Sequence, residues 1–82
     1  MPYFSYVLKN SVSGKFYKGH CQNLEIRLNE HLSGKTKTTS HEHKSWFVAY
    51  FETFESREEA IRRERYFKTA AGRRFLKSKN II

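Results

Sequence analysis

The chain has 82 residues, enough for one domain and no second one. Its 16 Lys and Arg against 8 acidic residues give a formal charge of +8 at pH 7, so a polyanion is the expected partner, nucleic acid first and an anionic membrane surface second. No apolar run approaches the ~20 residues of a membrane span, no signal peptide is recognisable, and the single cysteine allows no internal disulfide and fits a reducing cytoplasm.

Two strands and a tight turn are expected at the start of the chain. Residues 3–8 are rich in aromatic and β-branched side chains, and residues 15–20 are typical of the returning strand of a hairpin. Gly14 lies in the polar segment between them and can adopt the positive φ that such a turn requires. Tyr6 and Tyr17 fall on the paired strands, where packing of aromatic rings across the hairpin is their ordinary role.

A helix is expected over residues 24–33, because Asn23 is a good N-cap and Gly34 a good C-terminal stop. Its buried stripe consists of Leu24, Leu28 and Leu32. His31 lies on that face and Arg27 at its edge, so the two side chains project side by side. A histidine on an apolar face is usually a satisfied core residue, but the arginine beside it favours phosphate binding, since guanidinium is the preferred bidentate ligand of phosphate.

The middle of the chain contains a polar segment followed by an apolar one. Residues 35–45 are polar and lack periodicity, so we expect a basic surface loop there. Residues 46–54 then form the best strand candidate, and because this segment begins with an unbroken apolar run, a central position in the sheet is expected.

The last third of the chain predicts a long helix followed by a short one. Ser56 opens a capping box with Glu59, so a helix is expected over 57–70. A break is expected at Gly72, and a short terminal helix over 73–79. The order β-β-α-β-α predicts an α+β fold, with a small three-stranded sheet and its N-terminal hairpin flanked by helices.

Glu64 is the unusual residue of the long helix. On a helical wheel it falls about 40° from Ala60, inside an apolar stripe that also holds Phe67 and Ala71. A carboxylate taken out of water is costly unless a cation, a metal or strong donors hold it. The ordinary alternative is an ion pair with Lys68, in the favourable i, i+4 order. Position alone leaves both explanations open.

These residues together are suited to hydrolysis of a phosphodiester bond. A metal on Glu64 would neutralise the phosphate, Arg27 would hold the phosphoryl oxygens, and a tyrosine or histidine would orient or deprotonate a water. The sequence contains no Asp, so any metal chemistry must use Glu and His. The residues expected to line one concave surface are Tyr6, Tyr17, Arg27, His31 and Glu64.

The ordered set of motifs resembles the GIY-YIG endonuclease family, in particular its small stand-alone members related to the nuclease domain of the bacterial excision-repair incision subunit. The two tyrosine motifs stand here as Phe4-Ser5-Tyr6 and Tyr17-Lys18-Gly19, without the Gly and Ile of the first and with Lys in place of Ile in the second. The Leu-x-x-Arg-Leu-x-x-His helix stands at 24–31, and the Ala-x-x-x-Glu-x-x-x-Lys helix at 60–68. The resemblance covers about residues 3–79 and implies one nuclease domain over 1–82.

The resemblance also implies roles for the site residues. One of Tyr6 and Tyr17 would act as or assist the general base, and Arg27 would contact the scissile phosphate. Glu64 would be the single ligand of Mg²⁺ or Mn²⁺, and His31 corresponds to the additional polar residue of some members. The implied activity is that of a metal-dependent endonuclease on DNA, in repair or in the processing of structured DNA.

Nucleic acid, with DNA first, is therefore the expected partner, and no membrane partner is expected because no basic amphipathic helix is recognisable. The basic residues expected to contact it are Lys18, Lys35, Lys37, Lys44, Lys68, Arg73 and Arg74, with further affinity from Arg62, Arg63 and Arg65. Specificity would come from the shape of the substrate, a homodimer or a larger repair complex.

Other functions are weighed against this one. A non-catalytic nucleic-acid-binding module on the same fold would keep the basic surface, but it would gain nothing from a carboxylate such as Glu64 facing a polyanion. A His-metal nuclease using His41 and His43 lacks a matching ligand on a following helix. A zinc site that adds His20 and Cys21 to these histidines has equally weak support.

Overall fold

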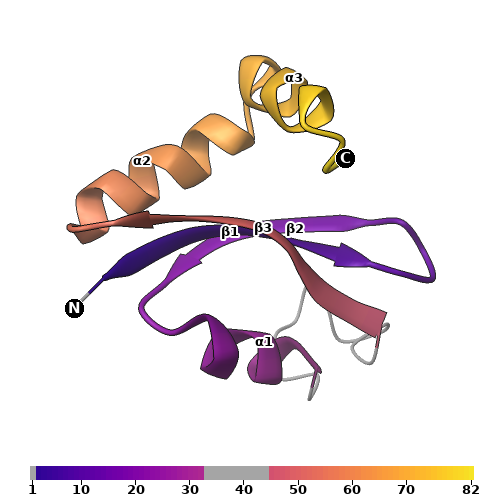
Figure 1. The fold of residues 1–82 in the computed structure, drawn as a ribbon, viewed down its shortest axis with the longest axis horizontal. Helices are drawn as coiled ribbons and strands as arrows, with labels where there is room; N and C mark the ends of the chain where they lie inside the picture. Colours follow the sequence, from indigo (N-terminus) through magenta and orange to yellow (C-terminus); the bar gives the residue numbers. More distant parts are fainter. Residues whose placement is uncertain (1, 33–44) are drawn as a thin grey trace.

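The computed structural model describes residues 2–32 and 45–82, which form an α+β fold, as the sequence predicts. The elements, in chain order, are β1 (Tyr3–Asn10), β2 (Phe16–Cys21), α1 (Leu24–Leu32), β3 (Trp46–Phe54), α2 (Arg57–Phe67) and α3 (Ala70–Ser78). Helix α1 covers one face of the three-stranded sheet, and α2 and α3 lie over the other face (Figure 1). None of the helices within these two ranges is long and apolar enough to cross a membrane.

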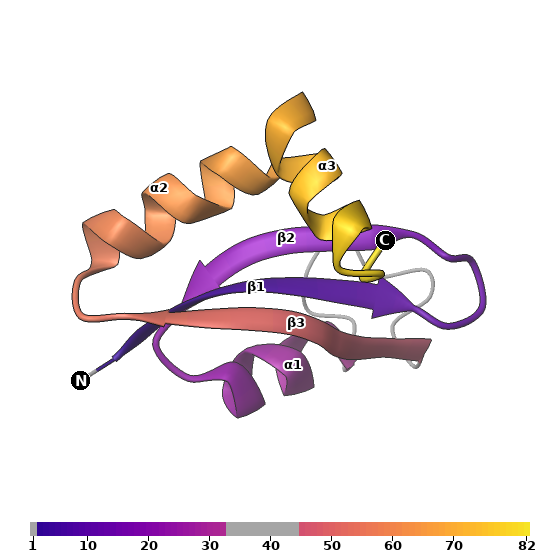
Figure 2. The ribbon, with the colours of Figure 1, turned by 45° about the horizontal axis from the view of Figure 1, so that its top comes forward.

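The sheet is antiparallel in the order β2-β1-β3, so β1 is the central strand (Figure 2). The expectation that residues 46–54 occupy the centre is wrong. Four consecutive residues of β1, from Ser5 to Leu8, are buried, whereas Phe47 and Phe51 of β3 are 43% and 49% exposed. An apolar run does not require a central position, because aromatic rings on an edge strand can keep favourable contacts with one neighbouring strand. Phe51 makes such a contact, edge-on, with Phe4 of β1.

Alternation along β1 creates two small cores, one on each face of the sheet. Tyr6 and Leu8 point towards α1 and pack with Trp46 and the leucines of that helix. Val7 points the other way and packs with Phe67 of α2 and Leu76 of α3. Each face is therefore fixed by different residues, although the strands are shared.

The break between the last two helices lies earlier than expected. Helix α2 is capped at Lys68, and Thr69 is the N-cap of α3, where its hydroxyl accepts from the Gly72 amide at 3.0 Å. Gly72 is inside α3, and a Cβ there would lie 1.8 Å from the carbonyl oxygen of Tyr66. This glycine therefore serves close packing between helices rather than a helix end, and Ala71, expected in the buried stripe, is exposed.

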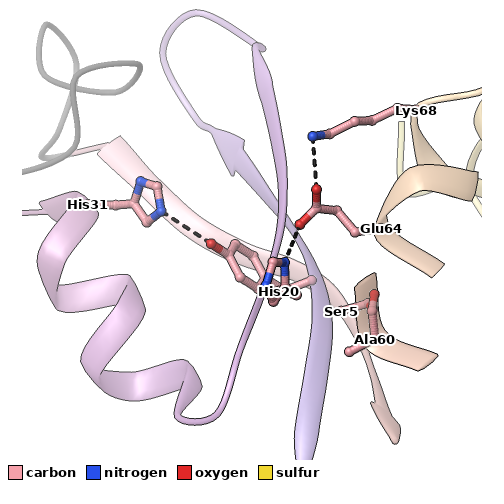
Figure 3. Close-up of polar contacts among 7 residues, drawn as sticks. Ser5, His20, His31, Ala60, Glu64 and Lys68 are labelled. Atoms are coloured by element: carbon pink, nitrogen blue, oxygen red, sulfur yellow. Dashed lines mark hydrogen bonds and ion pairs between the residues drawn. The ribbon is translucent and has the colours of Figure 1, made fainter. Parts of the chain in front are cut away.

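Side-chain hydrogen bonds of Asn10 and Ser5 fix the hairpin turn and the packing of α2 on the sheet. The side chain of Asn10 accepts from the amides of Val12 and Ser13, both at 2.9 Å, and Gly14 adopts φ 75°, as expected for this turn. The hydroxyl of Ser5 donates to the carbonyl of Ala60, which ties β1 to α2 (Figure 3).

Candidate active site at the β2 edge

The residues that the sequence analysis assigns to one site come together at β2, but on both of its faces. Side chains alternate along this edge strand: Tyr17 packs with the core under α1, whereas His20 is bonded to Glu64 of α2. The expectation of a single concave surface is therefore wrong. Two clusters take its place, the aromatic cluster on the α1 side (Tyr6, Tyr17 and His31) and the carboxylate cluster on the α2 side (His20, Glu64 and Lys68).

The aromatic cluster is closed to solvent at two of its three members. Tyr6 and His31 are buried, and the Tyr6 hydroxyl lies 3.4 Å from Nε2 of His31 (Figure 3). The Tyr17 ring stacks on Tyr6 with centroids 6.3 Å apart and tilts against His31 at 4.6 Å. Gly19 makes this packing possible, because a Cβ there would lie 2.5 Å from the Tyr6 hydroxyl oxygen.

Burial decides the protonation of this cluster. Burial and the neighbouring Tyr17 raise the pKa of Tyr6 well above its usual value, so its phenol stays protonated. Burial and the Arg27 charge lower the pKa of His31 and favour its neutral ring. Tyr6 is therefore suited to donate a hydrogen bond and unsuited to remove a proton. Tyr17, which is only half-buried, is the tyrosine that can reach a water.

The carboxylate cluster is charged and open at its rim. The Oε1 atom of Glu64 lies 2.6 Å from Nδ1 of His20, and its Oε2 lies 3.0 Å from Nζ of Lys68 (Figure 3). The Glu64 side chain is only 15% exposed, whereas that of Lys68 is 55% exposed. Burial alone would raise the pKa of Glu64, but the hydrogen bonds from His20 and Lys68 outweigh it and hold that pKa below its usual value. The carboxylate is thus ionised at neutral pH beside a partner that can move into solvent.

His20 is the member of this cluster that the sequence analysis missed as a site residue. It was considered only for a zinc site, yet strand alternation carries the necessary signal. If Tyr17 faces one helix, then residue 20 faces the other, where the structure places Glu64. The alternative role of Glu64, an ion pair with Lys68, is present as well.

A cleft of about 350 Å³ opens beside His20 of the carboxylate cluster, and its lining includes residues at the starts of α1 and α2. Its lining comprises Tyr3, His20, Cys21, Gln22, Asn23, Ile26, Arg27, Glu30 and Arg57. Arg27 is 39% exposed, and its Nη1 lies 3.5 Å from Oε1 of Glu30, so its guanidinium can turn to an anion in the cleft. His20 links the cleft to Glu64, since it lines the one and bonds the other.

Three of the expected nucleic-acid contacts gather on the α2 and α3 side of β2. Burial lowers the pKa of Lys18, as do the nearby charges of Arg73 and Lys68. Arg73 also donates from Nη1 to the Lys68 carbonyl oxygen at 2.9 Å. Cations held this close repel one another and favour an anionic partner. Arg74 is exposed on α3, while Lys35, Lys37 and Lys44, with His41 and His43, lie outside the described residues.

Arg63, by contrast, is not available for nucleic acid. It donates to both carboxylate oxygens of Glu52, at 2.7 and 3.1 Å. Its guanidinium lies 4.6, 5.2 and 4.7 Å from the ring centres of Tyr66, Phe67 and Phe75, respectively. The expected contribution of Arg63 to affinity is therefore replaced by a role in holding α2 and α3 on the sheet.

The donors at the site fit one hard cation held by a single carboxylate. Across residues 2–32 and 45–82, no group of three His, Cys or Glu side chains could hold a metal ion. Glu64 nonetheless offers a carboxylate next to His20, which lines the cleft. Mg²⁺ is commonly bound through one or two carboxylates, with water and substrate phosphate as its other ligands.

Three comparisons place these residues among known proteins. The family model described as the GIY-YIG catalytic domain matches residues 2–80. UPF0213 proteins of Streptococcus agalactiae serotype V and serotype III are each 35% identical to the chain over 68 residues, which is 83% of this chain and 76% of theirs. The solution NMR structure of a UPF0213 protein from Bacillus halodurans matches with a TM-score of 0.56 and 26% identity, covering 95% of this chain and 84% of that one.

Proposed function

Because the chain belongs to the GIY-YIG family, in the company of UPF0213 proteins, we propose that it is a divalent-metal-dependent endonuclease that hydrolyses phosphodiester bonds in DNA. The fold is nuclease-like, and the family implies a nucleic-acid substrate. We further infer that the ion is Mg²⁺ or Mn²⁺ and that the substrate is structured DNA in repair or processing. We expect the protein to act in the cytoplasm.

The observation that carries the proposal is the environment of Glu64. An ionised, largely buried carboxylate stands within a protein of charge +8, beside a cleft lined by Arg27 and His20. A protein that only bound a polyanion would gain nothing from this charge, because it repels phosphate. A bound cation reverses that effect and makes the same position attractive to a phosphodiester.

The chain's own residues divide the remaining work. Arg27 is placed to hold the phosphoryl oxygens, and a guanidinium can do so through two parallel hydrogen bonds. His20 fixes the orientation of the Glu64 carboxylate through its Nδ1 bond. A cation bound by Glu64 would neutralise the charge on the phosphate and on the leaving oxygen.

The aromatic cluster then has a supporting role with one exception. Tyr6 and His31 are buried and bonded to each other, so we assign them to positioning α1, and with it Arg27, against β2. Tyr17 is the tyrosine that we propose orients or deprotonates the attacking water, because its ring is only half-buried.

The bound strand would follow the basic residues of the α2 and α3 side. Lys18, Lys68, Arg73 and Arg74 would contact its phosphates, together with Lys35, Lys37 and Lys44 from the predicted loop. Each phosphate neutralised on duplex DNA contributes about −0.9 to the slope of log affinity against log salt, so binding should weaken steeply as salt rises.

One observation favours a second candidate, a nucleic-acid-binding module without cleavage. Tyr17 and Glu64 lie on opposite faces of β2, and Glu64 already has two partners that compete with a metal. If these partners are never displaced, the basic surface would still bind DNA while the carboxylate served only stability.

A cleavage assay on duplex, nicked, flapped and single-stranded DNA, with matching RNA, separates the two candidates. With Mg²⁺ or Mn²⁺, the wild type should cut at least one DNA substrate, and Glu64→Gln should not, while it binds equally or slightly more tightly. Gln keeps the size of the side chain but removes the charge that holds a hard cation. A wild type that cuts nothing, yet binds DNA and RNA with a steep salt dependence, would support the binding module.

A further inference from the structure

Arg57 is a residue to which no role has been given so far, and the register of the sheet brings it to the cleft. Pairing of Tyr3 with Phe54, and of Phe4 with Cys21, places the start of β1 and the ends of β2 and β3 together. Helix α2 begins directly after β3, so its first residue, Arg57, stands at the same end of the sheet as the start of α1 (Figure 1).

Two contacts fix the place of Arg57. Ser56, the N-cap of α2, accepts from the Glu59 amide at 3.2 Å and so holds the first turn of the helix. The Arg57 guanidinium then lies over the Tyr3 ring, 5.7 Å from its centre. Within the described parts of the chain, no carboxylate is paired with Arg57. Its charge is therefore available to a ligand.

The cleft thus receives cationic side chains from two helices on opposite faces of the sheet. Arg27 enters it from α1, Arg57 from α2, and His20 lies on the β2 edge between these helices. The volume of about 350 Å³ is near the lower end of the range of small-molecule pockets, about 300 to 1,000 Å³, which suits one nucleotide and not the width of a duplex. The exposed side chain of Ile26 gives the cleft an apolar wall as well.

We infer that this cleft takes one nucleotide of the bound strand, next to the scissile phosphate, and that Arg57 holds the neighbouring backbone phosphate opposite Arg27. The inference rests on the proposed function for the identity of the ligand as nucleic acid. It makes Arg57 a binding residue with the ring of Tyr3 as its support. Because the cleft is narrow, a strand with an unpaired nucleotide at this position is favoured over continuous duplex.

The test compares Arg57→Gln with Lys15→Gln, which removes the same charge from an exposed position outside the cleft. Affinity for a fluorescent single-stranded deoxyoligonucleotide is measured by anisotropy at fixed salt and without divalent metal, so that no cleavage occurs. Loss of a charge-assisted hydrogen bond should weaken binding at least about tenfold for Arg57→Gln. Lys15→Gln should weaken it by about twofold at most, and Arg57→Lys should restore only part of the affinity, because the two-pronged contact is lost.

Equal losses for Arg57→Gln and Lys15→Gln would overturn the inference, whether or not the wild type cuts DNA. A wild type that cuts nothing, combined with a selective loss for Arg57→Gln, would leave the nucleotide cleft standing and refute the nuclease. If the wild type cuts, its KM should be higher for a substrate with a single neutral methylphosphonate linkage beside the cleavage site than for the unmodified substrate. The KM of Arg57→Gln should be the same for both substrates. Additive effects of the two changes would place Arg57 away from that phosphate.

Discussion

Glu52 and Glu64 are two partly buried carboxylates on the same side of the sheet, held by neighbouring parts of α2, yet their surroundings differ. Glu52 receives two hydrogen bonds from Arg63, whose guanidinium is packed among three aromatic rings, and a third from the hydroxyl of Tyr50. Glu64 is held by His20 and by Lys68, which is more than half exposed. The two side chains are 20% and 15% exposed, so they differ in their partners: Glu52 is held by three donors, whereas Glu64 is bonded to His20, which lines the cleft.

Under the proposed function, this difference separates a structural ion pair at Glu52 from a functional one at Glu64. Three donors hold Glu52, and aromatic rings pack over the Arg63 guanidinium, so this partner is not easily displaced by a further ligand. The ion pair between Lys68 and Glu64 can be broken at small cost, because an exposed ion pair contributes only about 0 to 1 kcal/mol. A cation approaching from the cleft therefore competes with a weak partner at Glu64 and with strong ones at Glu52.

The largest expected effect comes from Arg27→Ala, which removes the guanidinium that α1 contributes to the cleft. If Arg27 stabilises charge that develops on the phosphate, single-turnover cleavage should slow by a factor of about 10² or more, while DNA affinity changes little. Arg65→Ala is the matched control and should leave the rate within about twofold. Equal rates for the two variants would remove Arg27 from the reaction and weaken the contrast between the two carboxylates.

Glu52→Gln tests whether the ion pair between Glu52 and Arg63 is structural. It leaves the partly buried charge of Arg63 without its partner, so the free energy of unfolding measured with urea should fall by about 1 to 3 kcal/mol. Cleavage per folded molecule should stay close to that of the wild type. A loss of cleavage as complete as that expected for Glu64→Gln would show that the two sites are not functionally distinct.

The dependence of folding stability on pH in acid tests the contribution of Glu52 in a second way. Burial alone would raise the pKa of Glu52, but the hydrogen bonds from Arg63 and Tyr50 outweigh it and lower that pKa in the folded chain. Below about pH 4 the unfolded chain therefore takes up this proton more readily, and the contribution of Glu52 is lost as pH falls through its lowered pKa. Wild-type stability should drop towards that of Glu52→Gln by about 1 kcal/mol over this range. A constant difference between the two proteins down to pH 2 would contradict this account.

Tyr6→Phe should have a smaller effect than Arg27→Ala or Glu52→Gln. It removes a hydroxyl whose contact with His31, at 3.4 Å, is long, so stability should fall by no more than about 1 kcal/mol. As a positioning residue, Tyr6 should alter kcat by less than about tenfold and leave its pH profile in place. A loss as large as that of Arg27→Ala, with a shifted profile, would make Tyr6 a catalytic residue.

Much of the fold could be predicted from local signals. The bounds of β3, the Ser56 cap and the turn at Gly14 follow from propensity and turn chemistry, and the structure confirms them. The order of strands could not be predicted, because an apolar run does not reveal whether a strand has one neighbour or two. The break at Thr69 was hidden for a related reason: Gly72 reads as a helix end until the close approach of Tyr66 is known.

The candidate site was predictable in its residues but not in its arrangement. Helical spacing identified Arg27, His31 and Glu64, because each position depends on one helix alone. The division between the two faces of β2 depends on which helix covers which face, and that is set by packing over the whole chain. His20 was missed for this reason, although its strand position relative to Tyr17 contained the information.

The most direct test of the central claim, that Glu64 is the carboxylate open to a cation, is paramagnetic broadening of backbone amide NMR signals by Mn²⁺. With increasing Mn²⁺, the signals of His20, Glu64 and Lys68 should broaden first, those of Glu52 and its neighbours on β3 should broaden only at higher Mn²⁺, and Glu64→Gln should abolish this order. Broadening that begins around Glu52, or that is unchanged in Glu64→Gln, would contradict the account.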